Sequence, residues 1–489
     1  MARVHASLLP PIVLDPAGAR PMYRQLSEWF RRAIIEGRLR PGQRIPSSRS
    51  LAEELKISRI PVLAAYEQLC AEGYLEAFTG AGTCVARSIV AARAKKPAPG
   101  RPRANGSGRT REISERARSI PSPPRPWLKN LGAFRLGLPA LDHLPLGVWS
   151  KLVRRHLRQP PKDLLAYGDA MGYVPFREAI AEYLGMFRGV ACEAAQVMIT
   201  TGSQQALQLI AHVLLDPGCR IWMEEPGYPG AHQALSMAGA RLGPVPVDHD
   251  GMDVGQGIQR WPDAAAVYIT PSHQFPLGTT LGAARRLALL NWAARSGAWI
   301  IEDDYDSEFR FDGHPVSALQ GLDADGRVIY IGTFSKVLFP ALRLGYMVLP
   351  KGLSEAFCTA RDATDTFSCP LYQLVMADFL REGHFARHIR RMRKLYMQRR
   401  TALVQAIGKH APDALRFVAS DTGMHLAAWL PPDVDDLALS SAAARKGVSV
   451  RPLSQCYLQS PGRSGLILGY GGASVPQINT GVRELASIL

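Results

Sequence analysis

Trp299-Ile300-Ile301-Glu302-Asp303-Asp304-Tyr305 and Val328-Ile329-Tyr330-Ile331-Gly332-Thr333-Phe334-Ser335-Lys336 are the two stretches that decide the fold. Each opens with a short apolar run and closes with polar, chemically reactive side chains. Continuous apolar runs of this length are typical of strands buried on both faces of a parallel sheet. The first stretch ends in carboxylates and a tyrosine, and the second ends in a lysine. Together they predict two buried strands that carry a chemical site.

The segments around these stretches continue an alternation of strands and helices. The run Val197–Thr200 precedes a helical pattern at Gln204–Leu214, and the strand-like runs Arg220–Met223 and Ala266–Thr270 follow. Such an alternation builds a mostly parallel sheet covered by helices. Residues 128–489 are therefore expected to form an α/β domain, and a chain of 489 residues is long enough for two or three domains.

The N-terminal residues have a different pattern, which indicates three short helices and a hairpin. Apolar residues recur at helical spacing over Tyr23–Ile34, Leu51–Leu55 and Val62–Leu69. Serines precede the second and third of these helices, where a side-chain oxygen can cap free N–H groups. A hairpin with a glycine-bearing tip at Gly80–Gly82 follows. This order predicts a winged helix-turn-helix domain over residues 1–87.

A basic segment at residues 88–127 separates the two predicted domains. It is rich in Pro, Gly, Ser and Arg and has too few apolar residues to form a core, so we expect a linker. Residues 1–126 carry +12 of the net charge of +16. A basic excess at one end of a chain is typical of a protein that binds a polyanion such as DNA.

The composition favours a soluble protein of the cytoplasm. Hydrophobic residues make up 47% of the chain and charged residues 20%, and no run of 18 apolar residues is present. No signal peptide is apparent at the N-terminus. The seven cysteines form no C-x-x-C pair, so we expect reduced thiols. No metal cluster is expected.

The chemistry of the two stretches indicates a pyridoxal phosphate (PLP) site. The amine of Lys336 can form an imine with an aldehyde if its pKa is lowered by burial or by nearby cations. Asp303 lies 33 residues upstream and can keep a pyridinium nitrogen protonated, which makes PLP an electron sink. Tyr305 can hydrogen-bond the ring hydroxyl. Asp304 is the alternative candidate for the carboxylate.

Further cofactor contacts are expected in the surrounding segments. The turn Thr201-Gly202-Ser203-Gln204 joins a strand to a helix, and its N–H groups with Ser203 can hold a phosphate at the helix N-terminus. Arg343 adds a cation, Tyr228 can stack on the ring, and His273 can contact the ring or its hydroxyl. The complete expected set is Lys336, Asp303, Tyr305, Gly202, Ser203, Gln204, Tyr228, His273, Thr333, Ser335 and Arg343.

The N-terminal domain resembles the GntR family of bacterial regulators over about residues 21–86. The resemblance is carried by Pro41-Gly42-Gln43-Arg44-Ile45-Pro46-Ser47-Ser48-Arg49, by Ala65-Tyr66-Glu67-Gln68-Leu69 and by Glu72-Gly73-Tyr74. It implies that the third helix enters the major groove and the wing tip the adjoining minor groove, which fits arginine and capped helix ends as DNA ligands. The DNA contacts expected from the resemblance are Arg49, Ser58, Arg59, Gly80 and Gly82.

The remainder of the chain resembles fold-type I aminotransferases. The motifs are Glu302-Asp303-Asp304-Tyr305-Asp306-Ser307-Glu308-Phe309-Arg310, Ser272-His273-Gln274-Phe275-Pro276-Leu277-Gly278 and the lysine stretch. With the N-terminal unit, the chain resembles the MocR subfamily of GntR regulators. The resemblance implies a winged helix-turn-helix joined to an α/β aminotransferase-like domain with a smaller C-terminal α+β subdomain. It also implies an imine of PLP on Lys336 and a domain-swapped homodimer in a bacterial cytoplasm.

The sequence favours a sensor over an enzyme. Arg451 and Arg463 are the candidates for binding an effector carboxylate, but Leu466–Tyr470 has no arginine where enzymes commonly supply one. We expect a regulator of transcription that binds double-stranded operator DNA and senses PLP, an amine or an amino acid. The alternatives are an active aminotransferase with an accessory N-terminal domain, and a DNA-binding scaffold with an inactive cofactor pocket.

Overall fold

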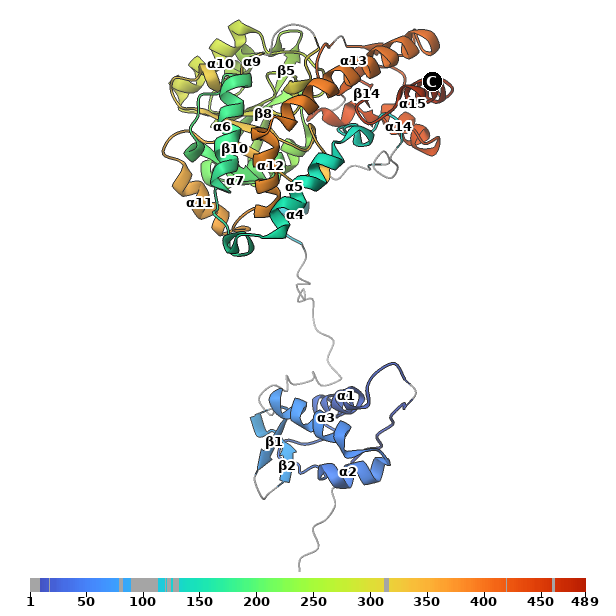
Figure 1. The fold of residues 1–489 in the computed structure, drawn as a ribbon. Coiled ribbons are helices and arrows are strands. Elements are labelled where there is room, and N and C mark those ends of the chain that lie inside the picture. Colours follow the sequence, from blue (N-terminus) through green and yellow to red (C-terminus); the bar gives the residue numbers. More distant parts are fainter. Residues whose placement is uncertain are drawn as a thin grey trace, which may run out of the picture. The chain divides into compact units, whose positions relative to one another are not determined.

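The chain folds into two compact units, one within Met1–Thr110 and one within Arg111–Leu489 (Figure 1). None of the helices in the described part of the chain has both the length and the apolarity that crossing a bilayer requires. The predicted linker falls largely outside the described residues, and within it helix α4 spans Glu115–Arg118. The computed structural model describes residues 9–16, 18–78, 82–88, 113–118, 120, 125, 132–311, 316–418, 420–459 and 462–489.

The N-terminal unit is a winged helix-turn-helix, as predicted. Its two strands pair antiparallel, with Leu75 opposite Val85 and Phe78 opposite Gly82. Ser47 caps the second helix, since its side chain accepts the N–H of Ser50. The elements are α1 (Met22–Ile35), α2 (Ser48–Leu55), α3 (Arg59–Ala71), β1 (Leu75–Phe78) and β2 (Gly82–Val85).

The core of this unit is formed by the apolar faces of its helices and the hairpin. Leu26, Phe30 and Leu69 are fully buried, and Phe30 packs edge-on against Tyr66. The hydroxyl of Tyr66 donates a hydrogen bond to the carbonyl of Pro46, which ties α3 to the segment before α2. These contacts hold the middle of α3 against α1 and against the segment that precedes α2.

The larger unit is built on an eight-stranded sheet with the order β3-β10-β9-β8-β7-β4-β5-β6. Strands β9, β8, β7, β4 and β5 pair in parallel, whereas β10 runs antiparallel to both neighbours. The prediction of buried, mostly parallel strands is confirmed. The strands are β3 (Val197–Thr200), β4 (Arg220–Glu225), β5 (Arg241–Asp248), β6 (Gly251–Met252), β7 (Ala266–Ile269), β8 (Trp299–Asp304), β9 (Val328–Thr333) and β10 (Gly345–Val348).

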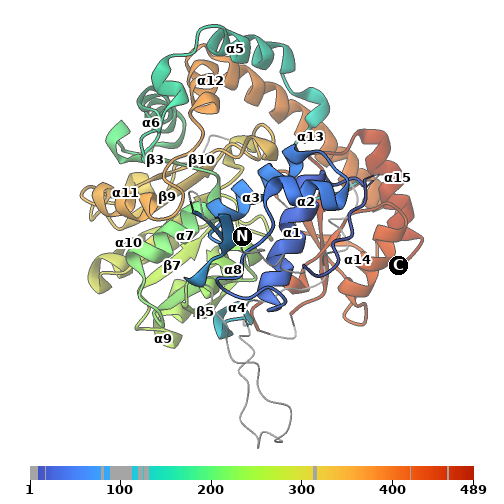
Figure 2. The same ribbon diagram turned by 90° about the horizontal axis from the view of Figure 1, so that it is seen from below.

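Helices cover both faces of this sheet (Figure 2). On one face α7, α8 and α11 pack on Ile221 and Ile301. On the other face α9 and α10 pack on Trp222 and Ile300, and α6, α12 and α13 pack on the strands further along. These helices are α6 (Val174–Arg188), α7 (Ser203–Leu214), α8 (Pro229–Met237), α9 (Val254–Arg260), α10 (Ala283–Ser296), α11 (Ser354–Asp362), α12 (Pro370–Arg381) and α13 (His384–His410).

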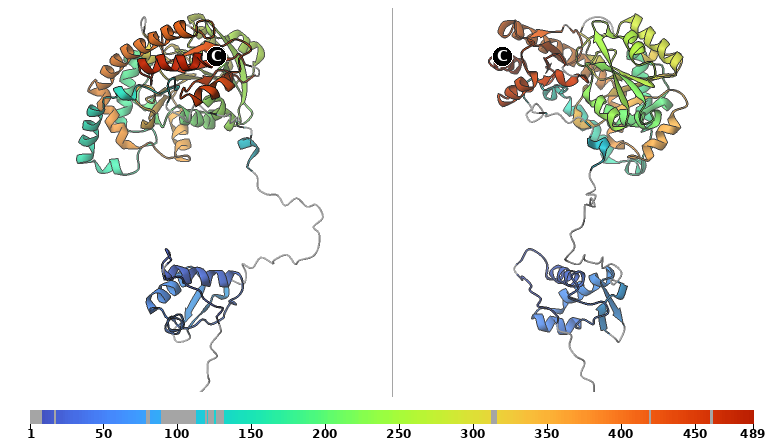
Figure 3. Two further views of the ribbon diagram at one scale, coloured as in Figure 1. Left: turned by 90° about the vertical axis from the view of Figure 1, so that its right-hand side faces the viewer. Right: turned by 180° about the vertical axis from the view of Figure 1, so that it is seen from behind.

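A smaller antiparallel sheet lies at the C-terminal end of the chain, beside the large sheet (Figure 3). Its strand order is β11-β12-β14-β13, and α13 leads into it from the large sheet. This is the predicted α+β subdomain. The strands of this sheet are β11 (Arg416–Phe417), β12 (His425–Trp429), β13 (Arg451–Pro452) and β14 (Gly465–Gly469), and the remaining α-helices of the larger unit are α5 (Leu146–Arg158), α14 (Asp436–Arg445) and α15 (Val475–Ala486).

Candidate functional site

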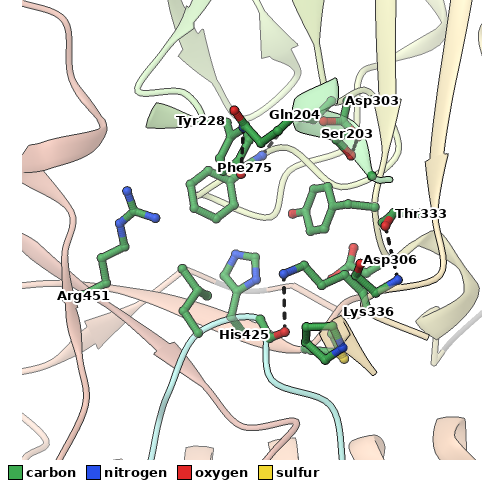
Figure 4. Close-up of a pocket in the computed structure, with 18 of the residues that line it drawn as sticks. Ser203, Gln204, Tyr228, Phe275, Asp303, Asp306, Thr333, Lys336, His425 and Arg451 are labelled. Atoms are coloured by element: carbon green, nitrogen blue, oxygen red, sulfur yellow. Dashed lines mark hydrogen bonds between the residues drawn. The ribbon is translucent and has the colours of Figure 1, made fainter. Parts of the chain in front are cut away.

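A pocket of about 280 Å³ lies where the ends of the large-sheet strands meet the small sheet (Figure 4). Strands β8 and β9 bring Asp303 and Lys336 to it, and strands β12 and β13 bring His425 and Arg451. The residues that line it are Leu136, Gly137, Gly202, Ser203, Gln204, Tyr228, Tyr268, Thr270, Phe275, Asp303, Tyr305, Asp306, Thr333, Ser335, Lys336, Pro340, Arg343, Met424, His425 and Arg451.

Lys336 presents a nucleophilic amine to the pocket. It follows the end of β9 by three residues, where the N–H of Ser335 is held by the hydroxyl of Thr333 at 3.2 Å. The amine Nζ donates to the carbonyl of Gly137 at 3.3 Å. Burial lowers the pKa of Lys336, which favours the neutral amine that imine formation needs.

Asp303 is the carboxylate that faces the pocket. Its oxygens accept hydrogen bonds from the hydroxyls of Tyr268 at 2.8 Å and Ser203 at 3.4 Å. Burial raises the pKa of Asp303 to about 6. A cationic ring nitrogen would restore the charged form, so this carboxylate fits a pyridinium partner.

Asp304, the alternative carboxylate, points to the other side of strand β8, because successive side chains of a strand alternate. It forms a buried ion pair with Arg188 at 2.6 Å. It also accepts hydrogen bonds from the hydroxyls of Tyr330 at 2.6 Å and Ser307 at 2.8 Å. Asp304 therefore stabilises the fold beneath the pocket and does not line it.

The ionisation of Asp303 predicts a pH-dependent affinity for PLP. Burial raises its pKa to about 6. Below that pH the carboxyl is neutral and cannot pair with the pyridinium, so affinity should rise as pH increases through about 6 and then level off. Dissociation constants of PLP measured between pH 5 and pH 8 test this. An Asp303→Asn variant is the control for the titration of PLP itself, and an equally steep profile in that variant would contradict the assignment.

A phosphate-binding corner lies at the N-terminus of α7. Gly202 precedes the helix with φ +126°, which only glycine adopts readily, and Ser203 begins it. A Cβ atom on Gly202 would lie 3.8 Å from both terminal guanidinium nitrogens of Arg343, so this cation lies over the helix start. Free N–H groups, a hydroxyl and a guanidinium together fit a phosphate group.

Aromatic rings form the walls between these charged ends. Tyr228 and Phe275 pack edge to face with their centroids 5.5 Å apart, and Gln204 donates to the Tyr228 hydroxyl at 3.4 Å. The guanidinium of Arg451 lies 5.9 Å from the Phe275 ring. The pocket thus has a flat apolar middle, which suits an aromatic ring, and a cation at the end away from the phosphate corner.

Ten of the eleven expected cofactor residues line this pocket, and His273 lies just behind it. His273 contacts the hydroxyl of Tyr305 at 3.0 Å and the carboxylate of Asp306 at 2.8 Å, so it reaches the pocket through these two lining residues. Of the two candidate effector arginines, the structure places Arg451 in the pocket. Arg463 is outside its lining, because its guanidinium stacks on the Trp429 ring at 4.0 Å.

Nine of the twenty lining residues were not among the candidates named from the sequence, and four of them matter most for the chemistry of the pocket. Gly137 has φ +70°, which favours glycine, and a Cβ atom there would lie 2.3 Å from the Lys336 amine. Tyr268, Asp306 and His425 complete the walls. The isolated hydroxyl of Tyr268 within the apolar strand β7 was a usable signal, whereas the other three come from loops and from the small sheet.

The proposed DNA contacts of the N-terminal unit are accessible. Arg49, Ser58 and Arg59 are exposed, and Nε of Arg59 donates to the hydroxyl of Ser48 at 3.1 Å. Ser58 occupies the N-cap position of α3, but its side chain makes no capping bond there. Gly82 has φ +90° and open space around it, whereas Gly80 lies outside the described residues.

Comparison with known proteins finds a matching family for each of the two units. The family described as bacterial regulatory proteins, gntR family, matches residues 22–85, and aminotransferase class I and II matches residues 137–466. The probable rhizopine catabolism regulatory protein MocR of Rhizobium meliloti is 41% identical and covers 97% of this chain and 95% of its own. The pyridoxine biosynthesis regulator PdxR of Corynebacterium glutamicum is 33% identical, with 94% of each chain covered.

Solved structures resemble the larger unit. A kynurenine aminotransferase of Pyrococcus horikoshii has a TM-score of 0.72 at 29% identity and covers 77% of this chain and 96% of its own. The α-aminoadipate aminotransferase LysN of Thermus thermophilus, complexed with N-(5'-phosphopyridoxyl)-L-leucine, has a TM-score of 0.69 at 29% identity, with 77% of this chain and 95% of its own covered.

The fold and the site thus define a DNA-binding winged helix joined to an aminotransferase-like domain that binds PLP. One pocket brings together a lysine amine, a carboxylate and a helix N-terminus beside a guanidinium, which are groups that fit the aldehyde, the ring nitrogen and the phosphate of PLP. The chain belongs to the MocR subfamily of GntR-type regulators, and it is a PLP-dependent regulator of transcription.

Proposed function

We propose that the protein senses a small amine or amino acid, or PLP itself, through an imine at Lys336, and that the state of this pocket sets how the N-terminal unit engages operator DNA. The observation that carries the proposal is that Lys336 and Arg451 line the same pocket. An amine that also bears a carboxylate matches both groups. The effect reaches DNA because ligands shift the population of two arrangements of the protein.

DNA binding measured at several ligand concentrations tests this proposal. Duplexes selected by the protein from a random pool serve as probes, and fluorescence anisotropy reports affinity with PLP alone and with amines that carry or lack a carboxylate. A change of affinity with PLP alone identifies the cofactor as the signal. A change that needs an amino acid identifies the adduct as the signal. Constant affinity under all conditions would refute sensing.

Arg451→Leu is expected to weaken the response to a carboxylate-bearing effector by roughly tenfold to 100-fold, because a bidentate hydrogen bond between ions is lost. The response to an amine without a carboxylate should change little. The matched control is Arg463→Leu, which removes the same charge from a guanidinium that lies on Trp429 outside the pocket. Equal losses in both variants would exclude Arg451 as the carboxylate ligand.

We also propose that the larger unit senses its ligand and does not turn it over. A second candidate function, an active aminotransferase, is favoured by the pocket residues that fit PLP and by the aminotransferases among the structural neighbours. A single half-reaction is compatible with sensing. Steady-state conversion of amino and keto acids at enzyme-like rates, about 1 s⁻¹ or more, would establish the enzyme instead.

We propose a domain-swapped homodimer, in which each DNA-binding unit packs against the larger unit of the partner. Support comes from large apolar side chains exposed near the start of the larger unit, where Tyr167 is 90% and Leu165 is 75% accessible. Clustered apolar side chains of this size mark interfaces. A bacterial regulator that binds DNA in this form works in the cytoplasm, at the nucleoid.

Mass photometry measures whether the protein is a dimer, and isotope-resolved crosslinking shows whether the DNA-binding unit of one chain packs against the larger unit of the other chain. Replacing both Leu165 and Tyr167 with Glu should shift the protein to monomers, whereas Met237→Glu, at a side chain that is 50% exposed on α8, should not. Crosslinks between the two units in dimers mixed from ¹⁴N and ¹⁵N chains should join unlike chains. Crosslinks within like chains only would refute the swap.

A further inference from the structure

A hydrogen-bonded series of three side chains, the buried Asp306 and His273 and the partly buried Tyr305, lies at the pocket wall. Nδ1 of His273 is 2.8 Å from Oδ1 of Asp306 and 3.0 Å from the hydroxyl oxygen of Tyr305. Asp306 and Tyr305 line the pocket, whereas His273 is 2% exposed and lies behind them. One ring nitrogen therefore faces two oxygens, and it can hold only one proton.

The chemistry of Asp306 determines where that proton lies. An ionised carboxylate only accepts hydrogen bonds, so Nδ1 of His273 must carry the proton and donate it. A protonated Nδ1 has no free lone pair and cannot accept the phenolic proton of Tyr305. Burial raises the pKa of Tyr305 well above its usual value, so the phenol also keeps its own proton. The phenol of Tyr305 can therefore donate its hydrogen bond to an acceptor in the pocket.

The ring of His273 is fixed by close packing as well. A Cβ atom on Gly423 would lie 2.0 Å from its Cε1 atom, and a Cβ atom on Gly278 would lie 3.2 Å from its Nε2 atom. Both glycines have positive φ, at +83° and +80°. Among the described residues Nε2 has no hydrogen-bond partner. A ring turned by 180° would place a C–H group against Asp306 and lose the hydrogen bond, so Asp306 sets both the orientation of the ring and its tautomer.

We propose that Asp306 and His273 are positioning residues that fix Tyr305 as a hydrogen-bond donor into the pocket, toward the anionic ring oxygen of PLP. The proposal deepens the proposed function, because it rests on the PLP ring lying against Tyr305. Without Asp306, Nδ1 could become an acceptor, and the phenol of Tyr305 would donate its hydrogen bond to Nδ1. Tyr305 would then offer a lone pair to the pocket, which repels an anionic oxygen.

The sign of the effect on PLP follows from charge. The ring oxygen carries most negative charge when the imine on Lys336 has lost its proton, so a donor at Tyr305 stabilises that state and lowers the pKa of the imine. Tyr305→Phe should raise this pKa by about one unit. His273→Phe should raise it by less, in the same direction, because the phenol remains but loses its orientation.

His273→Phe isolates the effect because it leaves the surrounding charges in place. The ionisable groups that act electrostatically on Tyr305 are the carboxylates of Asp306, Glu224, Asp303 and Asp304, and the ring of His425 lies 6.5 Å away. Asp306 also acts on Lys336 directly, so its own replacement would mix two effects. All of these groups remain in the His273→Phe protein.

The test is an absorbance titration of bound PLP in four proteins: the natural one, Tyr305→Phe, His273→Phe and the double variant. The double variant should match Tyr305→Phe, because His273 acts through Tyr305. A His273→Phe pKa equal to that of the natural protein, or a His273 effect that persists without the Tyr305 hydroxyl, would overturn the proposal. His232→Phe is the matched control, because its Nε2 is likewise buried and has no described partner.

A second measurement uses the natural protein without cofactor. ¹⁵N NMR of histidine-labelled protein reads the tautomer of His273, assigned by its loss in His273→Phe or by site-selective labelling. Nδ1–H is the expected form, and Nε2–H would refute the proposal even if the variants fold poorly. A protein with the Nδ1–H tautomer that binds no PLP would refute the proposed function and leave the hydrogen-bond arrangement standing.

Discussion

Lys336→Ala is expected to lose every covalent link to PLP while it keeps most of its basal affinity for DNA. Within the described residues, Lys336 supplies the one lysine amine that lines the pocket, and a methyl group cannot form an imine. The visible absorbance band of the imine should disappear, and borohydride should attach no PLP to the pocket peptides. Any response of DNA binding that depends on the imine should disappear with it. Absorbance, peptide mapping and anisotropy measure these outcomes.

The control for this substitution is Lys351→Ala. Lys351 is exposed and pairs with Glu193 at 3.1 Å, so its loss removes the same charge without touching the pocket. It should keep the absorbance band and the trapped cofactor. A reducible PLP adduct on the same pocket peptides of the Lys336→Ala protein would show that another nucleophile carries the cofactor, and the assignment of Lys336 would be wrong.

The combined replacement of Arg49 and Arg59 with Ala is expected to lower DNA affinity by roughly 30-fold to 10⁴-fold, since each specific arginine contact contributes about 1–3 kcal/mol. Both side chains are exposed, and the bond from Arg59 to Ser48 holds the start of α3 beside α2. The slope of log affinity against log salt should also fall by about one for each lost phosphate contact. Anisotropy at several salt concentrations measures both quantities.

Arg20 and Arg32 provide the matched pair for this experiment. Both are exposed on the same unit, and both pair with Glu28. Their replacement with Ala removes the same two charges, so it reports the effect of net charge alone and should cost little. Equal losses in the two double variants would show that Arg49 and Arg59 are not specific DNA ligands. The absorbance of bound PLP should be unchanged in both.

Much of the fold could be predicted because each helix or strand has a recognisable pattern of apolar residues over a short stretch of sequence. The apolar run before Asp303 specifies a buried strand, and alternation along it places Asp303 and Asp304 on opposite sides. The pattern alone did not show which of the two faces the pocket. That choice depends on Arg188, which is 116 positions away in the chain and pairs with Asp304.

The rest of the site depends on contacts between distant segments. Gly137 meets the Lys336 amine across 199 positions, and no local pattern marks it. His425 reaches the pocket from the small sheet, and its position depends on how the two sheets pack. The same packing separates Arg451, which faces the pocket, from Arg463, which stacks on Trp429. Sequence reasoning produced both arginines but had no means of ranking them.

Because two sheets form the pocket, the affinity for a ligand and the movement of one sheet against the other depend on each other. A molecule that touches Lys336 and Arg451 bridges the large sheet and the small sheet, so binding must restrict any rotation of one against the other. Thermodynamic linkage makes this effect reciprocal: a change that favours the arrangement to which the ligand binds also raises the affinity for the ligand. A substitution along α13, which joins the sheets without lining the pocket, can therefore retune the concentration at which the regulator responds.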